Sequence, residues 1–246
     1  MMLSNKVVVV TGGGRGIGKA ICLKLAGEGA HIVTCSRTRS ELAEVCATIE
    51  RNGGQCEYAV VDVTNFRDVG DFVAQTCARH GRVDVLVNNA GFCAPRRPVE
   101  EVSEEEYKQM MATNIAGVFH FTRFVVPIMK EQGNGVIITI SSGCGRRGFP
   151  GLSVYSASKF AVQGLMQAVA AELGTSPIRC VLINPGGVAT KMLSDLFGEV
   201  EASSQQSPAV VADLVPRVIA GEIEVPNGGG IIIRGGDIFG IYGPGE

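Results

Sequence analysis

Tyr155 and Lys159 stand four residues apart in the segment SVYSASKFAVQGL, so a helix would place both side chains on one face. A tyrosine has a pKa of about 10 and hardly ionises at neutral pH. A neighbouring ammonium group favours the phenolate, so we expect Lys159 to lower the pKa of the phenol. The pair is a candidate general acid and base, which would donate a proton to a carbonyl oxygen or accept one from an alcohol.

A glycine-rich turn lies between the first predicted strand and the first predicted helix, in VVVVTGGGRGIGKAI at 7–21. Glycines permit a tight turn and a close approach of the backbone to a pyrophosphate, and a helix start offers free N–H groups to an anion. Such turns are common, but this position makes the turn a candidate dinucleotide site. The residues assigned to it are Gly12, Gly14, Arg15, Gly16, Ile17 and Gly18.

The end of the second predicted strand, TCSRTRS, has no acid to bind the ribose hydroxyls of NAD. Ser36 and Arg37 stand there instead, and Arg37 together with Arg15 could pair with a 2′-phosphate. The pattern therefore favours NADPH over NADH. The alternatives are that Arg37 only solvates a helix start and that the protein is an NAD-dependent alcohol dehydrogenase. Asp62 and Val63, which end the third strand, are placed to meet the adenine.

Several motifs together resemble the short-chain dehydrogenase/reductase superfamily: TGGGRGIG at 11–18, NNAG at 88–91, YSASK at 155–159 and NPGGVAT at 184–190. They occur in the family's order and spacing across residues 5–190. The resemblance implies an NADP(H)-dependent oxidoreductase that interconverts a ketone and a secondary alcohol, of the 3-oxoacyl reductase or carbonyl reductase kind. A catalytically silent dinucleotide sensor of the same fold is the alternative.

The resemblance also implies roles for individual residues. Ser142 would hold the substrate oxygen, with Ser141 as its neighbouring competitor. Asn114 stands at the position of the family's proton-relay asparagine, and the alternative is an ordinary amide in a helix interior. Lys159 and Tyr155 would also contact the cofactor. The remaining predicted cofactor contacts are Asn88, Ala90, Gly91, Pro185, Gly186, Val188 and Thr190.

Short apolar runs alternate with segments of helical spacing, which predicts one α/β domain over 1–246. The expected fold is a Rossmann-type, doubly wound parallel sheet of about seven strands with helices on both faces and ligands at the carboxyl ends of the strands. Predicted strands occupy 6–12, 30–36, 55–63, 83–91, 134–142, 177–187 and 229–236. Predicted helices occupy 16–29, 39–54, 66–81, 104–133, 156–174 and 208–222. The irregular segment 187–207 is a candidate substrate-binding loop or lid.

The composition excludes several classes of partner. A formal net charge of −2 gives no electrostatic reason to bind nucleic acid or membranes, and no apolar run is long enough to span a bilayer. We therefore expect a cytoplasmic protein with a small-molecule substrate. The eight cysteines have irregular spacings that predict neither a disulfide framework nor a zinc site, and no metal is expected. The three histidines have no nearby acid or serine in a hydrolase arrangement.

Two features leave the assembly and the substrate open. The apolar helix over 119–129 and the Tyr155 helix resemble the family's four-helix interface, which implies a homodimer or homotetramer. Val181 replaces the asparagine that is common in this strand of the family, and the tail after Arg234 is atypical. Arginines at 96, 97, 146 and 147 flank the predicted cleft and either meet an anionic substrate or are solvated. Apolar walls are expected from Phe92, Phe149, Leu152, Met192 and Leu193.

Overall fold

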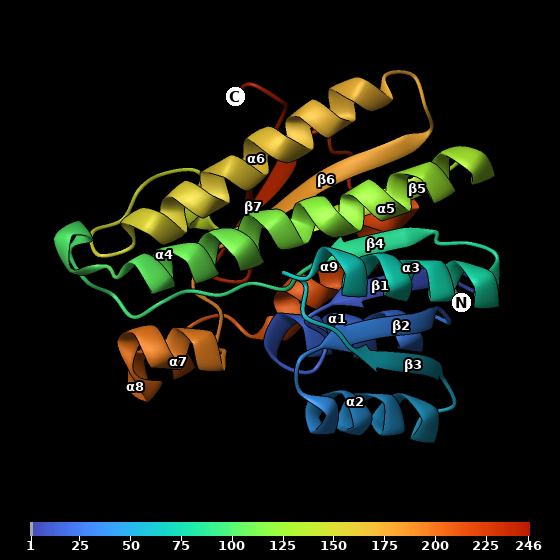
Figure 1. Ribbon diagram of the computed structural model, residues 1–246, viewed down its shortest axis with the longest axis horizontal. Coiled ribbons are helices and arrows are strands. Elements are labelled where there is room, and N and C mark those ends of the chain that lie inside the picture. Colours follow the sequence, from blue (N-terminus) through green and yellow to red (C-terminus); the bar gives the residue numbers. More distant parts are fainter. Residues whose placement is uncertain (1) are drawn as a thin grey trace.

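The computed structural model describes residues 2–246 as one eight-stranded sheet with helices on both faces (Figure 1). The strand order is β3-β2-β1-β4-β5-β6-β7-β8, and all neighbours are parallel except the β7–β8 pair. The predicted doubly wound α/β domain is confirmed. The strands are β1 (Val7–Thr11), β2 (His31–Ser36), β3 (Gln55–Val60), β4 (Val85–Asn88), β5 (Gly135–Ile140), β6 (Ile178–Pro185), β7 (Gly230–Arg234) and β8 (Asp237–Tyr242).

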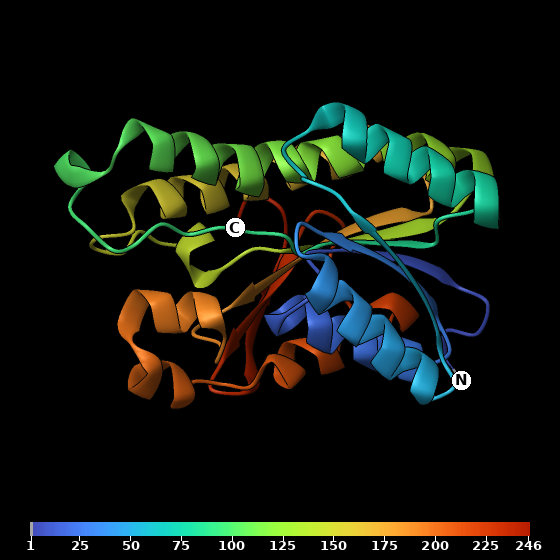
Figure 2. The same ribbon diagram turned by 60° about the horizontal axis from the view of Figure 1, so that its bottom comes forward.

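Two helical layers cover the sheet, as the turned view shows (Figure 2). One layer contains α1 (Gly16–Gly27), α2 (Arg39–Arg51) and α9 (Pro208–Ala220). The other contains α3 (Phe66–His80), α4 (Glu104–Met111), α5 (Gly117–Gln132) and α6 (Ser153–Leu173). The short helices α7 (Lys191–Phe197) and α8 (Glu199–Ser203) stand beside the carboxyl end of the sheet.

The valine run of β1 shows why these apolar segments form central strands. Val8 and Val10 belong to the core under α1 and α9, whereas Val7 and Val9 belong to the core under α3 and α5. All four are buried. Because successive side chains of a strand point to opposite faces, a strand covered on both sides needs a continuous apolar run.

The C-terminal segment differs from the expectation of about seven strands. β8 returns antiparallel to β7 through Gly235 and Gly236, whose φ angles of 59° and 98° suit glycine. The candidate lid at 187–207 is also more regular than predicted, because it contains α7 and α8. None of the helices in residues 2–246 combines the length and apolarity that crossing a bilayer requires.

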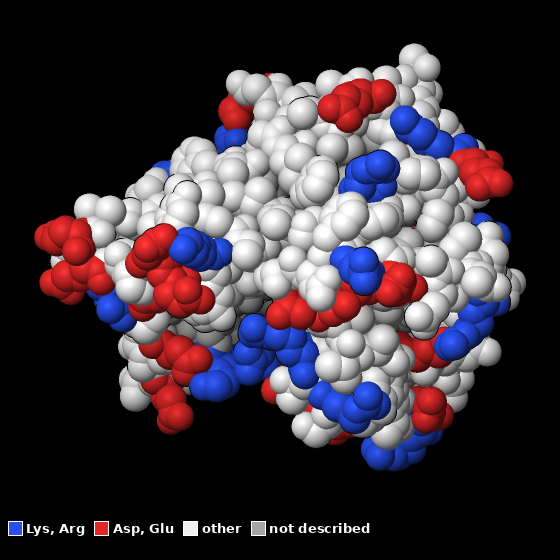
Figure 3. Space-filling view, viewed as in Figure 1, with Lys and Arg blue, Asp and Glu red and all other residues white. Residues whose placement is uncertain are grey.

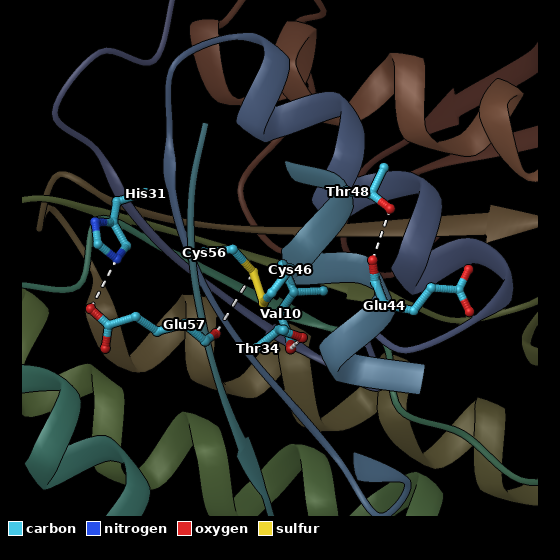
Figure 4. Close-up of a disulfide and its surroundings, with 8 residues drawn as sticks. All are labelled: Val10, His31, Thr34, Glu44, Cys46, Thr48, Cys56 and Glu57. Atoms are coloured by element: carbon cyan, nitrogen blue, oxygen red, sulfur yellow. Dashed lines mark hydrogen bonds and ion pairs between the residues drawn. A yellow bond between two sulfur atoms is a disulfide. The ribbon is translucent and has the colours of Figure 1, made fainter. Parts of the chain in front are cut away.

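The expectation of no disulfide is wrong at one pair. Cys46 of α2 and Cys56 of β3 are bonded, with their Cα atoms 5.1 Å apart (Figure 4). The pair arises because α2 packs directly over β3, which brings together two cysteines whose spacing of ten residues carries no known motif. The other six cysteines are free.

Candidate active site

One cleft of about 320 Å³ opens at the carboxyl ends of the strands. Its walls come from the glycine turn, the ends of β2 and β4, helix α6 and the start of α7. Arg15, Arg37 and Lys191 line it, and Lys and Arg side chains gather along the hollow that separates α7 and α8 from α2 (Figure 3). The cleft therefore has a basic margin that suits an anionic ligand.

The glycine turn presents an uncapped helix start to this cleft. The N-cap residue of α1 is Arg15, whose donor-only side chain makes no capping hydrogen bond, and the first turn contains no acid. Helices α3 and α9, by contrast, are capped by Asn65 and Ser207. A Cβ atom at Gly18 would lie 2.2 Å from the carbonyl oxygen of Gly12, so this glycine lets the helix close onto the strand. Free N–H groups and a positive dipole end fit a pyrophosphate.

Most of the predicted cofactor residues line the cleft together. This group contains Gly12, Gly14, Arg15, Gly16, Ile17, Ser36, Arg37, Asp62, Val63, Ala90, Gly91, Tyr155, Lys159 and Thr190. The predicted residues that do not line it are Gly18, Asn88, Pro185, Gly186 and Val188.

Asn89, which the sequence analysis did not single out, occupies the place expected for Asn88. Asn88 is buried and donates through Nδ2 to Thr122 Oγ1 at 3.3 Å, on the far side of its strand. Asn89 lines the cleft and donates through Nδ2 to the carbonyl oxygens of Thr11 and Gly12 at 2.9 and 3.2 Å. The alternation of side chains along an extended segment explains the exchange.

A carboxylate does stand at the ribose end of the cleft, although none follows β2 directly. Glu41, in the first turn of α2, lines the cleft and pairs with Arg15 at 3.7 Å. A Cβ atom at Gly14 would lie 3.2 Å from Glu41 Oε2 and 3.4 Å from Ser36 Oγ. The sequence analysis missed this residue because it comes from the next helix. The end of the cleft where we expect the cofactor's ribose thus contains Arg37 together with the Arg15–Glu41 ion pair.

The Tyr155 phenol is half-buried, and the nearby Ser142 hydroxyl acts to lower its pKa against the effect of burial. Ser142 Oγ also accepts from the N–H of Cys144 at 3.1 Å. Ser141, the competitor, points beneath α6, where its hydroxyl donates to the carbonyl oxygen of Lys159 at 3.5 Å. Ser142 thus lies near the phenol, whereas Ser141, and not Ser142, lines the cleft together with Tyr155.

Lys159 is 5% exposed, and its Nζ donates to the carbonyl oxygen of Ile140 at 3.1 Å. Burial lowers the pKa of its ammonium group to about 8. The Nζ lies 5.7 Å from the centre of the Tyr155 ring. Burial raises the pKa of Tyr155, and the neighbouring Cys93 and Cys144 raise it further. This direction is opposite to the one expected from the sequence, because desolvation of the phenolate outweighs the distant ammonium.

Asn114 lies in a π-helical turn, Ala112–Ala116, inserted between α4 and α5. Its Oδ1 accepts from the N–H of Phe92 at 2.8 Å, and its Nδ2 donates to the carbonyl oxygen of Phe92 and to Ser158 Oγ at 2.8 and 2.9 Å. A Cβ atom at Gly91 would lie 3.5 Å from Asn114 Oδ1 and 3.7 Å from Lys159 Nζ. Asn114 thus supports the wall beside Lys159 without lining the cleft itself.

A buried polar network lies under α6. Tyr242 of β8 donates through its hydroxyl to Gln163 Oε1 at 2.7 Å and accepts from Asn184 Nδ2 at 2.8 Å. Gln163 Nε2 donates in turn to Asn184 Oδ1 and to Ser141 Oγ. This network connects the last strand to the residues beneath Lys159. The atypical sequence of the tail did not predict this contact.

The family description "short chain dehydrogenase" matches residues 6–201 of this chain. The chain belongs to the short-chain dehydrogenase family. It is an oxidoreductase of the kind that binds NAD or NADP, consistent with the cleft.

Two curated relatives and one solved structure illustrate the range of this family. A 3β-hydroxysteroid dehydrogenase of Mediterraneibacter gnavus is 38% identical over 76% of this chain and 68% of its own length. An NADPH-dependent pterin aldehyde reductase of Arabidopsis thaliana is 31% identical over 94% of this chain and 95% of its own. The 3-ketoacyl-(acyl-carrier-protein) reductase of Brucella melitensis, crystallised with NADH, is 28% identical with a TM-score of 0.88 and covers 95% of this chain and 98% of its own.

The arginines that flank the dehydrogenase cleft do not line it. Arg97 pairs with Glu106 at 3.1 Å, and the guanidinium groups of Arg96, Arg146 and Arg147 stack on aromatic rings. Of the expected apolar walls, Phe92 and Met192 line the cleft, and Thr113 and Asp195 line it as well without having been predicted. These engaged arginines are not placed to meet a substrate.

Proposed function

We propose that this short-chain dehydrogenase interconverts ketones and secondary alcohols, with Tyr155 as general acid and base. The observation that carries the proposal is that a half-buried phenol and a buried ammonium group share one cleft with an uncapped helix start. A nicotinamide cofactor, when bound in this cleft, would supply or take up the hydride. This chain's own residues then handle the proton and hold the reacting oxygen.

Each residue has a distinct part in this mechanism. Ser142 donates a hydrogen bond to the substrate oxygen and orients it toward the phenol. Tyr155 gives its proton to that oxygen during reduction and takes it back during oxidation. Lys159 holds positive charge next to the phenol, and its lowered pKa of about 8 suits exchange of protons near neutral pH. Asn114 fixes the wall beside Lys159 through the Phe92 backbone.

NADPH is the proposed cofactor, with Arg37 as reader of the 2′-phosphate. Arg37, Arg15 and Lys191 support this choice by their charge at the ribose end of the cleft. Glu41 acts against it, because its carboxylate neutralises Arg15 in part and resembles an acceptor for ribose hydroxyls. One named relative is described as NADPH-dependent, and one named structure is a complex with NADH.

The segment 187–207 serves as the proposed lid, since α7 contributes Lys191, Met192 and Asp195 to the cleft. A homodimer or homotetramer is proposed from the exposed Phe119 of α5 and Phe160 of α6, which leave apolar surface on adjacent helices.

The test is a Tyr155→Phe variant assayed with NADPH and NADP against a panel of ketones and secondary alcohols. We expect turnover to fall about 1,000-fold, while the dissociation constant for NADPH, measured by fluorescence, stays within about threefold because the phenol has no part in binding the pyrophosphate. Unchanged turnover would refute the role of Tyr155. Tight NADPH binding by the wild type without turnover of any compound would support the silent sensor instead.

A further inference from the structure

His31, Glu57 and His80 meet at the end of the sheet opposite to the cleft. His31 begins β2, whereas Ser36, which lines the cleft, ends the same strand. Glu57 lies on the neighbouring strand β3, and His80 is the last residue of α3. The sequence analysis saw no acid near these histidines, because 26 and 23 residues separate the three positions and only the fold brings them together.

The three side chains converge on one point. His31 Nε2 and His80 Nε2 each lie 3.2 Å from the same oxygen, Glu57 Oε1, and the two rings are 4.4 Å apart at their centres. All three atoms lie within 4.8 Å of one another. Figure 4 shows the His31 ring next to the Glu57 carboxylate, on the other side of β3 from the disulfide.

Both Nε2 atoms are buried and have no hydrogen-bond partner. Each Nε2 lies within hydrogen-bond distance of Glu57 Oε1 and yet makes no hydrogen bond to it. The lone-pair direction of each nitrogen, which lies in the plane of its ring, must therefore point beside that oxygen and not at it. This is the geometry of ligands that face a common point between them, and not of two imidazoles that donate to one carboxylate.

The hydrogen-bond partner of His31 is consistent with two Nε2 atoms that act as ligands. His31 Nδ1 lies 3.2 Å from Gln55 Oε1, an acceptor, and when Nδ1 donates to it Nε2 is the ring nitrogen left to bind a metal.

We propose that His31, Glu57 and His80 bind one divalent transition-metal ion of the zinc class. Ligands at about 2.0–2.1 Å in a tetrahedron lie roughly 3.3 Å apart, which matches the two measured separations of 3.2 Å. Imidazole nitrogens with one carboxylate oxygen form a ligand set that zinc accepts, and water would complete it.

Neighbouring groups have defined effects on this site. Gln55 holds the His31 tautomer from behind, as partners of metal-bound histidines do. Arg79 pairs with the other carboxylate oxygen, Glu57 Oε2, and so leaves Oε1 for the metal, although its charge weakens cation binding. The metal would join β2, β3 and the end of α3, far from the reacting groups, and so would stabilise the fold.

The test is titration of the full-length wild-type protein with Zn²⁺ by calorimetry and with Co²⁺ by visible absorption. We expect one ion per chain, bound with a dissociation constant below about 10 µM, and a higher Tm when Zn²⁺ is present. His80→Gln and His31→Gln should each weaken Zn²⁺ binding at least 100-fold, since losing a ligand costs no less than losing its supporting partner. Gln55→Leu should weaken it about 10-fold.

His120→Gln is the matched control, because His120 bonds to Val63 far from this cluster, and it should leave Zn²⁺ binding unchanged. Circular dichroism and NADPH binding verify that each variant is folded. Equal Zn²⁺ affinity in the wild type, His31→Gln and His80→Gln would overturn the proposal. So would the absence of binding at 10 µM, or a thiolate-to-cobalt charge-transfer band, which would assign the ion to cysteines.

Discussion

The two ends of the central strands differ in how many hydrogen-bond partners their buried polar groups have. At the amino end, Asp84 is 3% exposed and fully partnered: Lys6, the N–H of Val7 and Arg82 all donate to its carboxylate. At the carboxyl end, Lys159 is 5% exposed and has one hydrogen bond, to a carbonyl oxygen, while the α1 start has no cap. The partnered end stabilises the fold, and the other end keeps its polar groups available for a ligand.

The pKa shifts express the same difference. Burial acts to raise the pKa of Asp84, but Arg82, Val7 and Lys6 outweigh it and hold the pKa below its usual value. Burial lowers the pKa of Lys159 to about 8, with no carboxylate to restore it. One buried charge is therefore compensated by its neighbours, and the other is not.

The largest expected effect tests the partnered end. Asp84→Asn should lower the free energy of unfolding by about 3 kcal/mol at pH 7, because it removes a charge from a buried network, while the ratio of NADPH to NADH turnover stays unchanged. Since the pKa of Asp84 is lowered in the folded state, its stabilisation is present above about pH 4 and is lost as the pH falls further. Urea unfolding at pH 7 and pH 3 measures both effects.

Asp213→Asn is the control for that experiment, because Asp213 is exposed and pairs with Lys24 at 3.5 Å. It should cost less than about 0.5 kcal/mol. An equal loss of unfolding free energy in both variants would mean that the buried Asp84 network stabilises the fold no more than an exposed ion pair does.

The next effect concerns the cofactor at the open end. Arg37→Glu should lower the NADPH-to-NADH ratio of kcat/KM about 30-fold, because a charged hydrogen bond to the 2′-phosphate is replaced by repulsion. Glu41→Gln should raise the same ratio about threefold, since Arg15 would lose its competing partner. Steady-state kinetics with both cofactors measure the ratios. If neither ratio moves, another group reads the phosphate.

A smaller effect on stability tests Lys159, the buried charge that no carboxylate compensates. Lys159→Met should abolish most turnover yet raise the free energy of unfolding at pH 7 by about 1–2 kcal/mol, because a buried charge is removed. The folded pKa of about 8 lies below the ordinary 10.5, so the unfolded chain binds more protons between these values. Wild-type stability should therefore rise with pH in this window, and the gap to the variant should narrow. Lys130→Met, at an exposed position, serves as control.

The smallest effect concerns the network under α6. Tyr242→Phe removes the hydroxyl that joins Gln163 and Asn184, and should cost about 1 kcal/mol of unfolding free energy. The exposed Tyr107 provides the control, since Tyr107→Phe should be neutral within about 0.3 kcal/mol. A loss of the same size in both variants would show that the network adds nothing.

The sequence predicted the parallel core and most of the cleft because periodicity and glycine context are local signals. The valine run of β1 and the glycine turn are examples of such signals, and both lie where expected. The direction in which a side chain points was harder to predict from the sequence, since Asn89 takes the place that we expected for Asn88. Contacts between separate elements were missed: Glu41 of α2 at the cleft, the Cys46–Cys56 bond between α2 and β3, and the pairing of β8 with β7. The pKa direction of Tyr155 was also wrong, because burial is a property of the folded chain.

The bond between Tyr242 and Gln163 spans 79 residues and joins the last strand to the catalytic helix. During synthesis, the glycine turn and α6 leave the ribosome well before β8 does. A nascent chain could therefore form its dinucleotide half early, while the support beneath Lys159 waits for the final strand to dock. The polar network beneath Lys159 is therefore completed only after β8 has been synthesised.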